Sequence, residues 1–261
     1  MDENTQNPNP LNFNKSNKVK IENNSNSSGA FLLMVGIIVA AIILSYGLRN
    51  IKEKGESITV KGYAEMTIKS DLAVWRITIN SRKTILSESY NNLVSSKSKI
   101  REYLAKNGIS DKVITESSLS SYTIYDNING TETSNVKGYN MSQSIIITTN
   151  DIQKVTQLSL KINELLSEGI EFNSNPPEYY VSDIGKYKMQ MLGEALKDAQ
   201  KRAEVIAKSV GNSISGIKYA KQGIFQITPL NSTEISDWGV NDVSSIEKSI
   251  KSVVDAAFYI K

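Results

Sequence analysis

The residues of this chain that could carry out chemistry are carboxylates, hydroxyls and amines, because the sequence contains neither histidine nor cysteine. A Cys/His zinc site, a haem ligand, a thiol nucleophile and a Ser-His-Asp triad are therefore excluded. The acidic residues Glu65, Glu102, Glu116 and Glu171 stand at isolated positions, and the sequence places no second carboxylate beside any of them. A hydrolase of the paired-carboxylate type is left without support. We predict no catalytic residue, no metal site and no cofactor.

The glycine and charge patterns argue against phosphate-binding and nucleic-acid-binding sites. Gly62 and Gly138 each stand in a Lys-Gly-Tyr triplet, without the spacing of a dinucleotide-binding or P-loop motif. Within strands, such glycines mark bulges or close packing. With 30 Lys and Arg against 27 Asp and Glu, the net charge of +3 is too small and too evenly spread to predict a nucleic-acid partner.

One aromatic residue stands out in a polar part of the chain. Trp238 is the only large aromatic residue in the polar stretch 231–242. A loop tryptophan either folds back onto the core or anchors a partner, because its large apolar ring is unfavourable in water. Folding back is the expected outcome, and the alternative makes Trp238 a candidate interface residue.

An apolar segment near the N-terminus predicts a membrane anchor. Residues 29–48 form an uncharged run of about twenty residues, the length that an α-helix needs to cross a bilayer. The alternative is a cleaved signal peptide, but the run is longer than a signal-peptide core and lacks a small-x-small cleavage site before Arg49. We expect a retained transmembrane helix over 29–48, after a disordered Asn/Ser-rich tail over 1–28 and before a linker over 49–56.

The charges that flank this segment do not determine its orientation. Positive residues occur on both sides, so the positive-inside rule is undecided. They are Lys15, Lys18 and Lys20 before the run and Arg49, Lys52, Lys54 and Lys61 after it. The folded region that follows is either cytoplasmic or exported.

Two alternating segments open the folded region. Residues 57–69 alternate between apolar and polar with the period of a half-buried strand. The next segment repeats the pattern, with four apolar residues on one face: Ala73, Trp75, Ile77 and Ile79. Because only the short polar turn Lys69-Ser-Asp71 separates the segments, we predict an antiparallel hairpin.

Helices and further strands alternate in the rest of the chain. Apolar residues at helical spacing predict helices over 87–107, 151–169 and 183–211. The third helix has an apolar stripe that ends in Ile206 and Val210, and a charged face with Lys201 that we interpret as solvated. Strands are expected at about 113–126, 136–149, 170–181, 214–228 and 250–260.

This order of elements, β-β-α-β-β-α-β-α-β-β, predicts the fold class. Paired strands interleaved with helices are typical of an α+β domain rather than of a parallel, doubly wound one. We therefore predict a mainly antiparallel sheet over 57–261, covered by helices on one side and preceded by one transmembrane helix.

The last two strands are expected to expose a sheet edge. Terminal strands present unpaired backbone groups, which must be covered, charged or paired with another chain. The segments 214–228 and 250–260 are strongly apolar for positions so near the end of the chain. The candidate interface residues on them and on the intervening loop are Trp238, Ile224, Phe225, Ile227, Phe258 and Ile260. This pattern favours self-association.

Several short motifs resemble the SIMPL domain family. The segment Ile58-Thr-Val-Lys-Gly62 is similar to the family's I-[ST]-V-x-G opening, and Ser70-Asp-Leu-Ala73 is similar to its P-D-x-A turn, with serine in place of proline. Other segments extend the resemblance over about 57–261. They are the strand Trp75–Ile79, the helix that ends in Asn107-Gly-Ile109, the strand region with Tyr122, and the Ala-rich helix Ala195–Ala207 before Val210-Gly211.

The resemblance implies an exported bacterial protein, in the periplasm or tethered to a membrane, with loose links to oxidative-stress defence and envelope maintenance. It supplies no catalytic residues, since none is established for the family. It also implies an α+β domain on the periplasmic side of the inner membrane and a tendency to form ring-like oligomers. The orientation left open by the charges is thereby resolved.

Three functions are consistent with the sequence. The first is a non-enzymatic, single-pass inner-membrane protein that contacts the lipid bilayer through 29–48 and forms a ring-like homo-oligomer in the periplasm. The second is a monomeric periplasmic binding module that recruits another envelope protein or a ligand. The third, a carboxylate-dependent hydrolase, has the least support. The mass of the purified domain distinguishes the first two.

Overall fold

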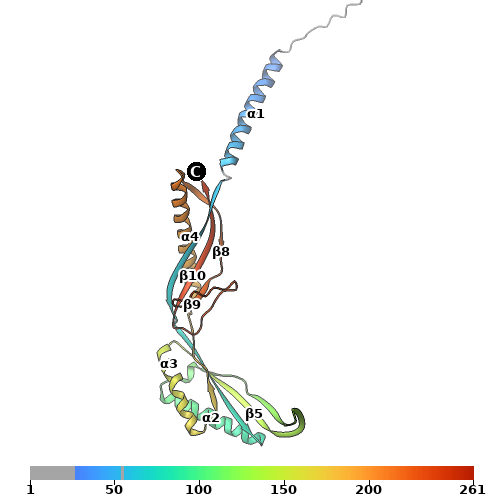
Figure 1. The fold of residues 1–261 in the computed structure, drawn as a ribbon, viewed down its shortest axis with the longest axis vertical. Helices are drawn as coiled ribbons and strands as arrows, with labels where there is room; N and C mark the ends of the chain where they lie inside the picture. The colour runs from blue at the N-terminus through green and yellow to red at the C-terminus, as the bar shows by residue number, and fades with distance from the viewer. Residues whose placement is uncertain (1–26, 54–55) are drawn as a thin grey trace, which may run out of the picture. The chain divides into compact units, whose positions relative to one another are not determined.

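The structure, a computed structural model, describes residues 27–53 and 56–261. The chain divides into two compact units, Met1–Lys54 and Gly55–Lys261. The first contains helix α1 (Ser27–Glu53), and the second contains two β-sheets with their helices (Figure 1). The tail predicted over 1–28 lies outside the described residues, except for its last two positions, which belong to α1.

Helix α1 exposes an apolar surface. Every residue from 31 to 47 is exposed, and most of them are aliphatic. Among the described residues, no helix is both long enough and apolar enough to cross a membrane. The structure thus contains the helix predicted over 29–48 but does not show it to be a transmembrane anchor.

The first sheet of the folded unit consists of four antiparallel strands. The last strand of the chain, β10 (Glu247–Ile260), lies at its centre. β1 (Ser57–Lys69) pairs along one side of β10, and β8 (Ile214–Gln222) and β9 (Gln226–Pro229) pair along the other. The predicted edge position is therefore wrong for 250–260. It is confirmed for β8, whose residues are exposed except at Ile214.

Helix α4 (Ile184–Ser209) covers one face of this sheet. Its N-cap is Asp183, whose carboxylate accepts a hydrogen bond from Lys186 N at 3.2 Å. The buried face of the helix consists mainly of small residues, namely Met191, Ala195, Ala199, Ala203 and Ala207. The predicted stripe is wrong at its C-terminal end, because Ile206 and Val210 are exposed and Ala207 takes the buried position.

The second sheet is built around β2 (Leu72–Lys83) and β5 (Thr131–Thr149), which pair in antiparallel register. β6 (Phe172–Ser174) and β7 (Glu178–Tyr180) pair with the other side of β2. Pro176 and Pro177 lie between these two short strands, as expected of prolines at a sheet edge.

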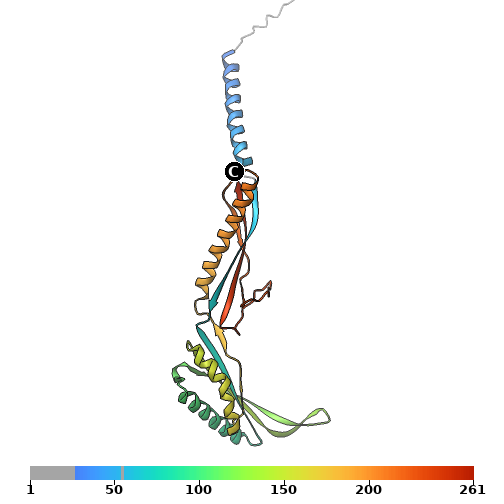
Figure 2. The ribbon, with the colours of Figure 1, turned by 60° about the vertical axis from the view of Figure 1, so that its left-hand side comes forward.

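Two further strands pair with β5 on the side away from β2. They are β3 (Ile114–Glu116) and β4 (Ser120–Ile128). Asn129 and Gly130 have φ values of 52° and 85° and form the predicted turn between β4 and β5. The resulting hairpin projects from the sheet in both views (Figures 1 and 2).

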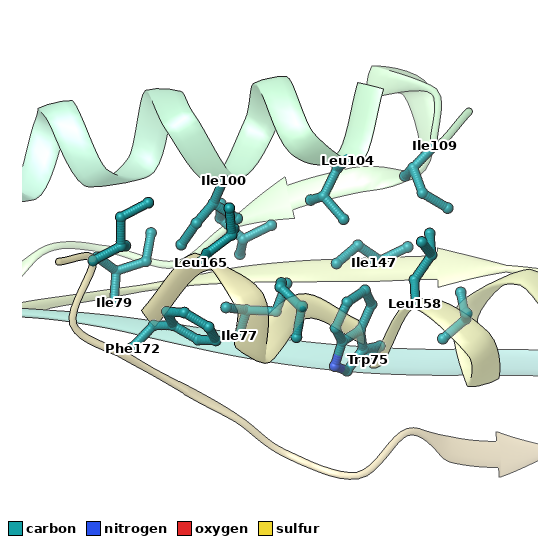
Figure 3. Packing of buried hydrophobic residues seen from close by; sticks show 14 of the residues in the cluster. Trp75, Ile77, Ile79, Ile100, Leu104, Ile109, Ile147, Leu158, Leu165 and Phe172 are labelled. Atoms are coloured by element: carbon teal, nitrogen blue, oxygen red, sulfur yellow. The ribbon is translucent and has the colours of Figure 1, made fainter. Parts of the chain in front are cut away.

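Helical segments cover one face of the second sheet and enclose the largest core (Figure 3). They are α2 (Leu86–Lys106) and α3 (Ile152–Lys161), which continues as the 3-10 helix η2 (Ile162–Glu168); a 3-10 turn, η1 (Asp111–Val113), precedes β3. The face predicted on β2 is confirmed, because Trp75 and Ile77 are fully buried with Leu104 of α2. The indole Nε1 of Trp75 donates to Ser174 Oγ at 3.0 Å, so this buried polar atom is satisfied.

β1 and β2 do not form the predicted hairpin. β1 pairs with β10 and β2 pairs with β5, so the chain passes from the first sheet to the second at Ser70 and Asp71. Ser70 N donates to Ile246 O at 2.8 Å, and Asp71 N donates to Tyr180 O at 2.9 Å. The prediction failed because a period of two identifies a strand and its buried face but not the strand that pairs with it.

Candidate functional site

The candidate site is the loop between β9 and β10, residues 230–246, which projects beside β9 (Figure 2). Ile227 N donates to Val240 O at 2.8 Å, and Asp242 N donates to Ile227 O at 2.9 Å. These bonds form a parallel bridge between Ile227 and Asn241. The returning half of the loop is therefore held against β9 by strand-like bonds.

A buried amide holds the middle of the loop. Gln226 is 8% exposed, and its Nε2 donates to Ser236 O at 2.7 Å. Its Oε1 accepts from Val240 N at 2.8 Å and from Ser236 N at 3.4 Å. One side chain thus satisfies backbone groups of two loop segments, and a fully bonded buried amide restricts the loop to one conformation. The sequence does not identify Gln226 as a functional residue, because its residue type does not reveal that it is buried.

This network holds Trp238 in solvent. The exposed fraction of Trp238 is 95%, so the expectation that it folds back onto the core is wrong. Its backbone N–H donates to Ser236 Oγ at 3.2 Å. The next residue, Gly239, has a φ of +88°, and a Cβ there would lie 2.9 Å from Ile224 Cγ2. The turn that displays the tryptophan therefore requires glycine.

An open groove of about 520 Å³ lies beside Trp238. Lys188 Nζ, from the first half of α4, lies 5.8 Å from the centroid of the Phe225 ring, within cation–π range. The large apolar residues that line the groove are Ile184, Ile224, Phe225, Ile227, Trp238 and Val240. Four residues of the predicted interface thus lie together. Ile224 and Trp238 are exposed, whereas Phe225 is half-buried and Ile227 is buried beneath them. Exposed apolar side chains around a groove are typical of a binding surface.

The other two predicted interface residues lie apart from this surface. Phe258 is buried against the alanines of α4, and Ile260 is half-buried at the end of β10. β9 pairs with residues 248–251 at the opposite end of β10. Because β10 is central and α4 covers one of its faces, Phe258 is a core residue and the predicted set does not form one surface.

A buried lysine ties the end of the loop to both sheets. Lys248 is buried, and its Nζ donates to Tyr179 O at 2.6 Å and to Asp242 O. Burial lowers the pKa of Lys248, although the charge of Asp242 opposes the shift. Burial also acts to raise the pKa of Asp242, but hydrogen bonds from Ser244 and Ser245 and the charge of Lys248 together outweigh it and lower that pKa. Lys248 therefore links β7, the loop and β10.

Glu65, one of the carboxylates singled out in the sequence, is held in ionised form. Glu65 accepts hydrogen bonds from Ser249 Oγ at 2.5 Å and from the Tyr63 hydroxyl. These bonds lower the pKa of Glu65, while burial and the bond to Glu65 raise the pKa of Tyr63 to about 12. An ionised carboxylate cannot act as a general acid near neutral pH. Within residues 27–53 and 56–261, no group of three or more acidic side chains gathers as a metal site would require.

The fold and the site together define an α+β domain of two antiparallel sheets that displays a tryptophan on a hydrogen-bonded loop. The family described as SIMPL, protein of unknown function (DUF541), matches residues 58–245, and the chain belongs to that family. The matched residues include both halves of the displayed loop and end just before β10. The resemblance found in the sequence is thereby confirmed. A comparison with curated proteins found no match.

Proposed function

We propose that the SIMPL domain of this chain is a non-enzymatic, self-associating module. The observation that carries the proposal is Trp238, fully displayed on a loop that Gln226 holds in place. Tryptophan is enriched among the residues that dominate binding energy at interfaces, and large apolar rings are unfavourable in water. A preorganised loop also loses little conformational entropy on binding. These features support a role as an interface anchor.

We further propose that the segment 29–48 attaches the domain to the bacterial inner membrane, with the domain in the periplasm. Support comes from the uncharged apolar run of the sequence and from the exposed apolar side chains of α1. An anchor on every copy would raise the local concentration and favour a ring-like assembly. Resemblance to the family supports a role in envelope maintenance or oxidative-stress defence.

The mass of the protein in solution tests the self-association. The unit Gly55–Lys261 contains both sheets and the clusters of buried apolar side chains between each sheet and its helices. We therefore expect it to fold without α1. Light scattering should give a multiple of the monomer mass for this unit and for the full chain in detergent. Trp238→Ala should lower that mass while the circular dichroism stays unchanged.

A monomer at every concentration would instead favour the second function, a binding module for another envelope protein or a ligand. The same displayed loop supports that function. An unfolded Trp238→Ala variant would show that the tryptophan is structural, which its 95% exposure argues against.

Fractionation tests the membrane attachment. The full chain should stay in the membrane fraction through high-salt and alkaline washes, whereas the Gly55–Lys261 unit should be soluble. Recovery from the soluble periplasm of a chain that begins near residue 50 would show a cleaved signal peptide and refute the anchor.

A further inference from the structure

A second groove, of about 560 Å³, lies between β1 and the C-terminal half of α4. Val205 and Ile206 line it and are 69% and 46% exposed. Its charged lining residues are Lys61, Lys201 and Arg202, of which Lys61 pairs with Asp255 at 2.6 Å and Arg202 pairs with Asp198 at 2.7 Å. The surface therefore combines exposed apolar side chains with the positive charge of Lys201, and we refer to it as the β1–α4 groove.

The displayed loop has the complementary composition. The segment 230–241 contains two acidic residues, Glu234 and Asp237, and no basic residue. Both acidic side chains are exposed, as are Trp238 and Ile235, the latter at 79%. Acidic and apolar groups on one surface match basic and apolar groups on the other, and an indole ring is a favourable neighbour for lysine and arginine.

The loop and the groove lie at opposite edges of the same sheet. β9, from which the loop leaves, pairs with one side of β10, whereas β1, which lines the groove, pairs with the other. They are also offset along β10, since Ile227 pairs with Ile250 and Val60 pairs with Ala256, about 20 Å further along the strand. A copy whose loop is fixed by Gln226 therefore cannot fill its own groove.

We infer that the loop of one copy docks through Trp238 into the β1–α4 groove of a second copy. The inference rests on the self-association proposed above and names its contact. Because the two surfaces differ, the contact is heterologous and repeats head to tail, which gives a ring when the rotation closes and a filament when it does not.

The free edge of β1 supports docking by side chains rather than by an added strand. Asp198 of α4 accepts a hydrogen bond from Tyr63 N at 2.9 Å and another from Arg202 Nε at 2.7 Å. This carboxylate occupies a backbone donor that an added strand would need. The groove side of the sheet thus favours an inserted side chain such as Trp238.

Two variants of the full chain in detergent separate the two surfaces. Trp238→Ala removes the anchor of the loop, and Val205→Glu places a negative charge in the groove, where it would face Glu234 and Asp237. Each variant alone should fall to the monomer mass in light scattering. Leu160→Glu makes the same change at a 77% exposed position of α3, outside both surfaces, and should assemble as the wild type does.

An equal mixture of the two variants is the decisive sample. The Trp238→Ala copy keeps an intact groove, and the Val205→Glu copy keeps an intact loop, so one productive contact remains between them. The mixture should form 1:1 heterodimers and no larger species. Asp237→Lys and Lys201→Glu should each weaken assembly, and combining them in one chain should restore part of it.

The outcomes distinguish the loop–groove contact from self-association in general. A wild type that is monomeric overturns both the self-association and the loop–groove contact. A wild type that assembles while Trp238→Ala and Val205→Glu leave its mass unchanged overturns only the loop–groove contact. Variants that each abolish assembly but do not complement one another overturn the head-to-tail arrangement in favour of a symmetric one. Unchanged circular dichroism of each variant excludes misfolding as the cause.

Discussion

Gly62 of β1 lies so close to α4 that a Cβ at this position would be 2.0 Å from Ala195 O and 2.7 Å from the Cβ of Ala199. No side chain fits between the strand and the helix there, which explains why the buried face of α4 consists mainly of alanines. Of the two roles expected for Gly62, a bulge or close packing, close packing is confirmed. This contact fixes the helix against the strand that lines the β1–α4 groove.

Gly62→Ala should therefore destabilise the domain. The added methyl group would force α4 away from β1, and overpacking of this kind costs about 1–3 kcal/mol in the free energy of unfolding. Urea unfolding measures the change. Gly193→Ala is the matched control on α4, because a Cβ there meets nothing within 4 Å and should stabilise the helix by about 0.5–1 kcal/mol. Equal effects of the two substitutions would contradict the close contact.

The large core predicts strong effects at two positions far apart in the sequence. Ile77 of β2 and Leu104 of α2 are fully buried in one cluster, so Ile77→Ala and Leu104→Ala should each cost about 2–5 kcal/mol. Lys201→Ala, at an exposed position, should change stability by less than about 0.5 kcal/mol. Thermal or urea unfolding of the isolated domain provides the comparison. Small effects at all three positions would show that the assigned faces are wrong.

Acid should weaken the attachment of β3 to α2. The hydrogen bond from Lys97 lowers the pKa of Glu116, with help from Arg101 and against burial. The two N–O distances are 2.7 and 2.6 Å. Because the pKa of Glu116 is lower in the folded than in the unfolded state, its ion pairs stabilise the fold at pH values above the unfolded-state pKa. That stabilisation is lost as pH falls through the folded-state pKa.

Glu116→Gln should therefore cost about 1 kcal/mol at pH 7 and less at pH 3. Unfolding by urea at both pH values tests this difference. Glu88→Gln, at an exposed position of α2, serves as the control and should be nearly neutral at both pH values. A Glu116→Gln penalty that persists unchanged at pH 3 would exclude the ion pairs as its cause.

The two tryptophans should respond oppositely to a quencher of fluorescence. Trp75 is fully buried and Trp238 is almost fully exposed. Acrylamide should quench Trp238 in the dilute monomer, and Trp238→Phe should leave emission that is poorly quenched. If the loop docks into another copy, quenching of the wild type should fall as concentration rises. Poor quenching of Trp238 at monomeric concentrations would contradict its displayed position.

Local patterns in the sequence determined the elements and their buried faces. The apolar alternation of β2 is buried as predicted at Trp75 and Ile77. Apolar residues at helical spacing in the helix predicted over 151–169 are also buried, from Val155 of α3 to Leu165 of η2. The turn at Asn129 and Gly130 also forms where its residue types require it. These features depend on neighbours within a few residues, so the period of hydrophobicity and turn chemistry suffice to predict them.

Tertiary structure alone decided which strands pair and which side chains stay in solvent. β1 pairs with β10, nearly two hundred residues later in the chain, because that pairing lets both strands bury their apolar faces under α4. Trp238 is exposed because the buried amide of Gln226 fixes the loop away from the core. Such outcomes depend on contacts between distant segments. A sequence read along its length specifies periods and turns, but not the partners that the completed fold brings together.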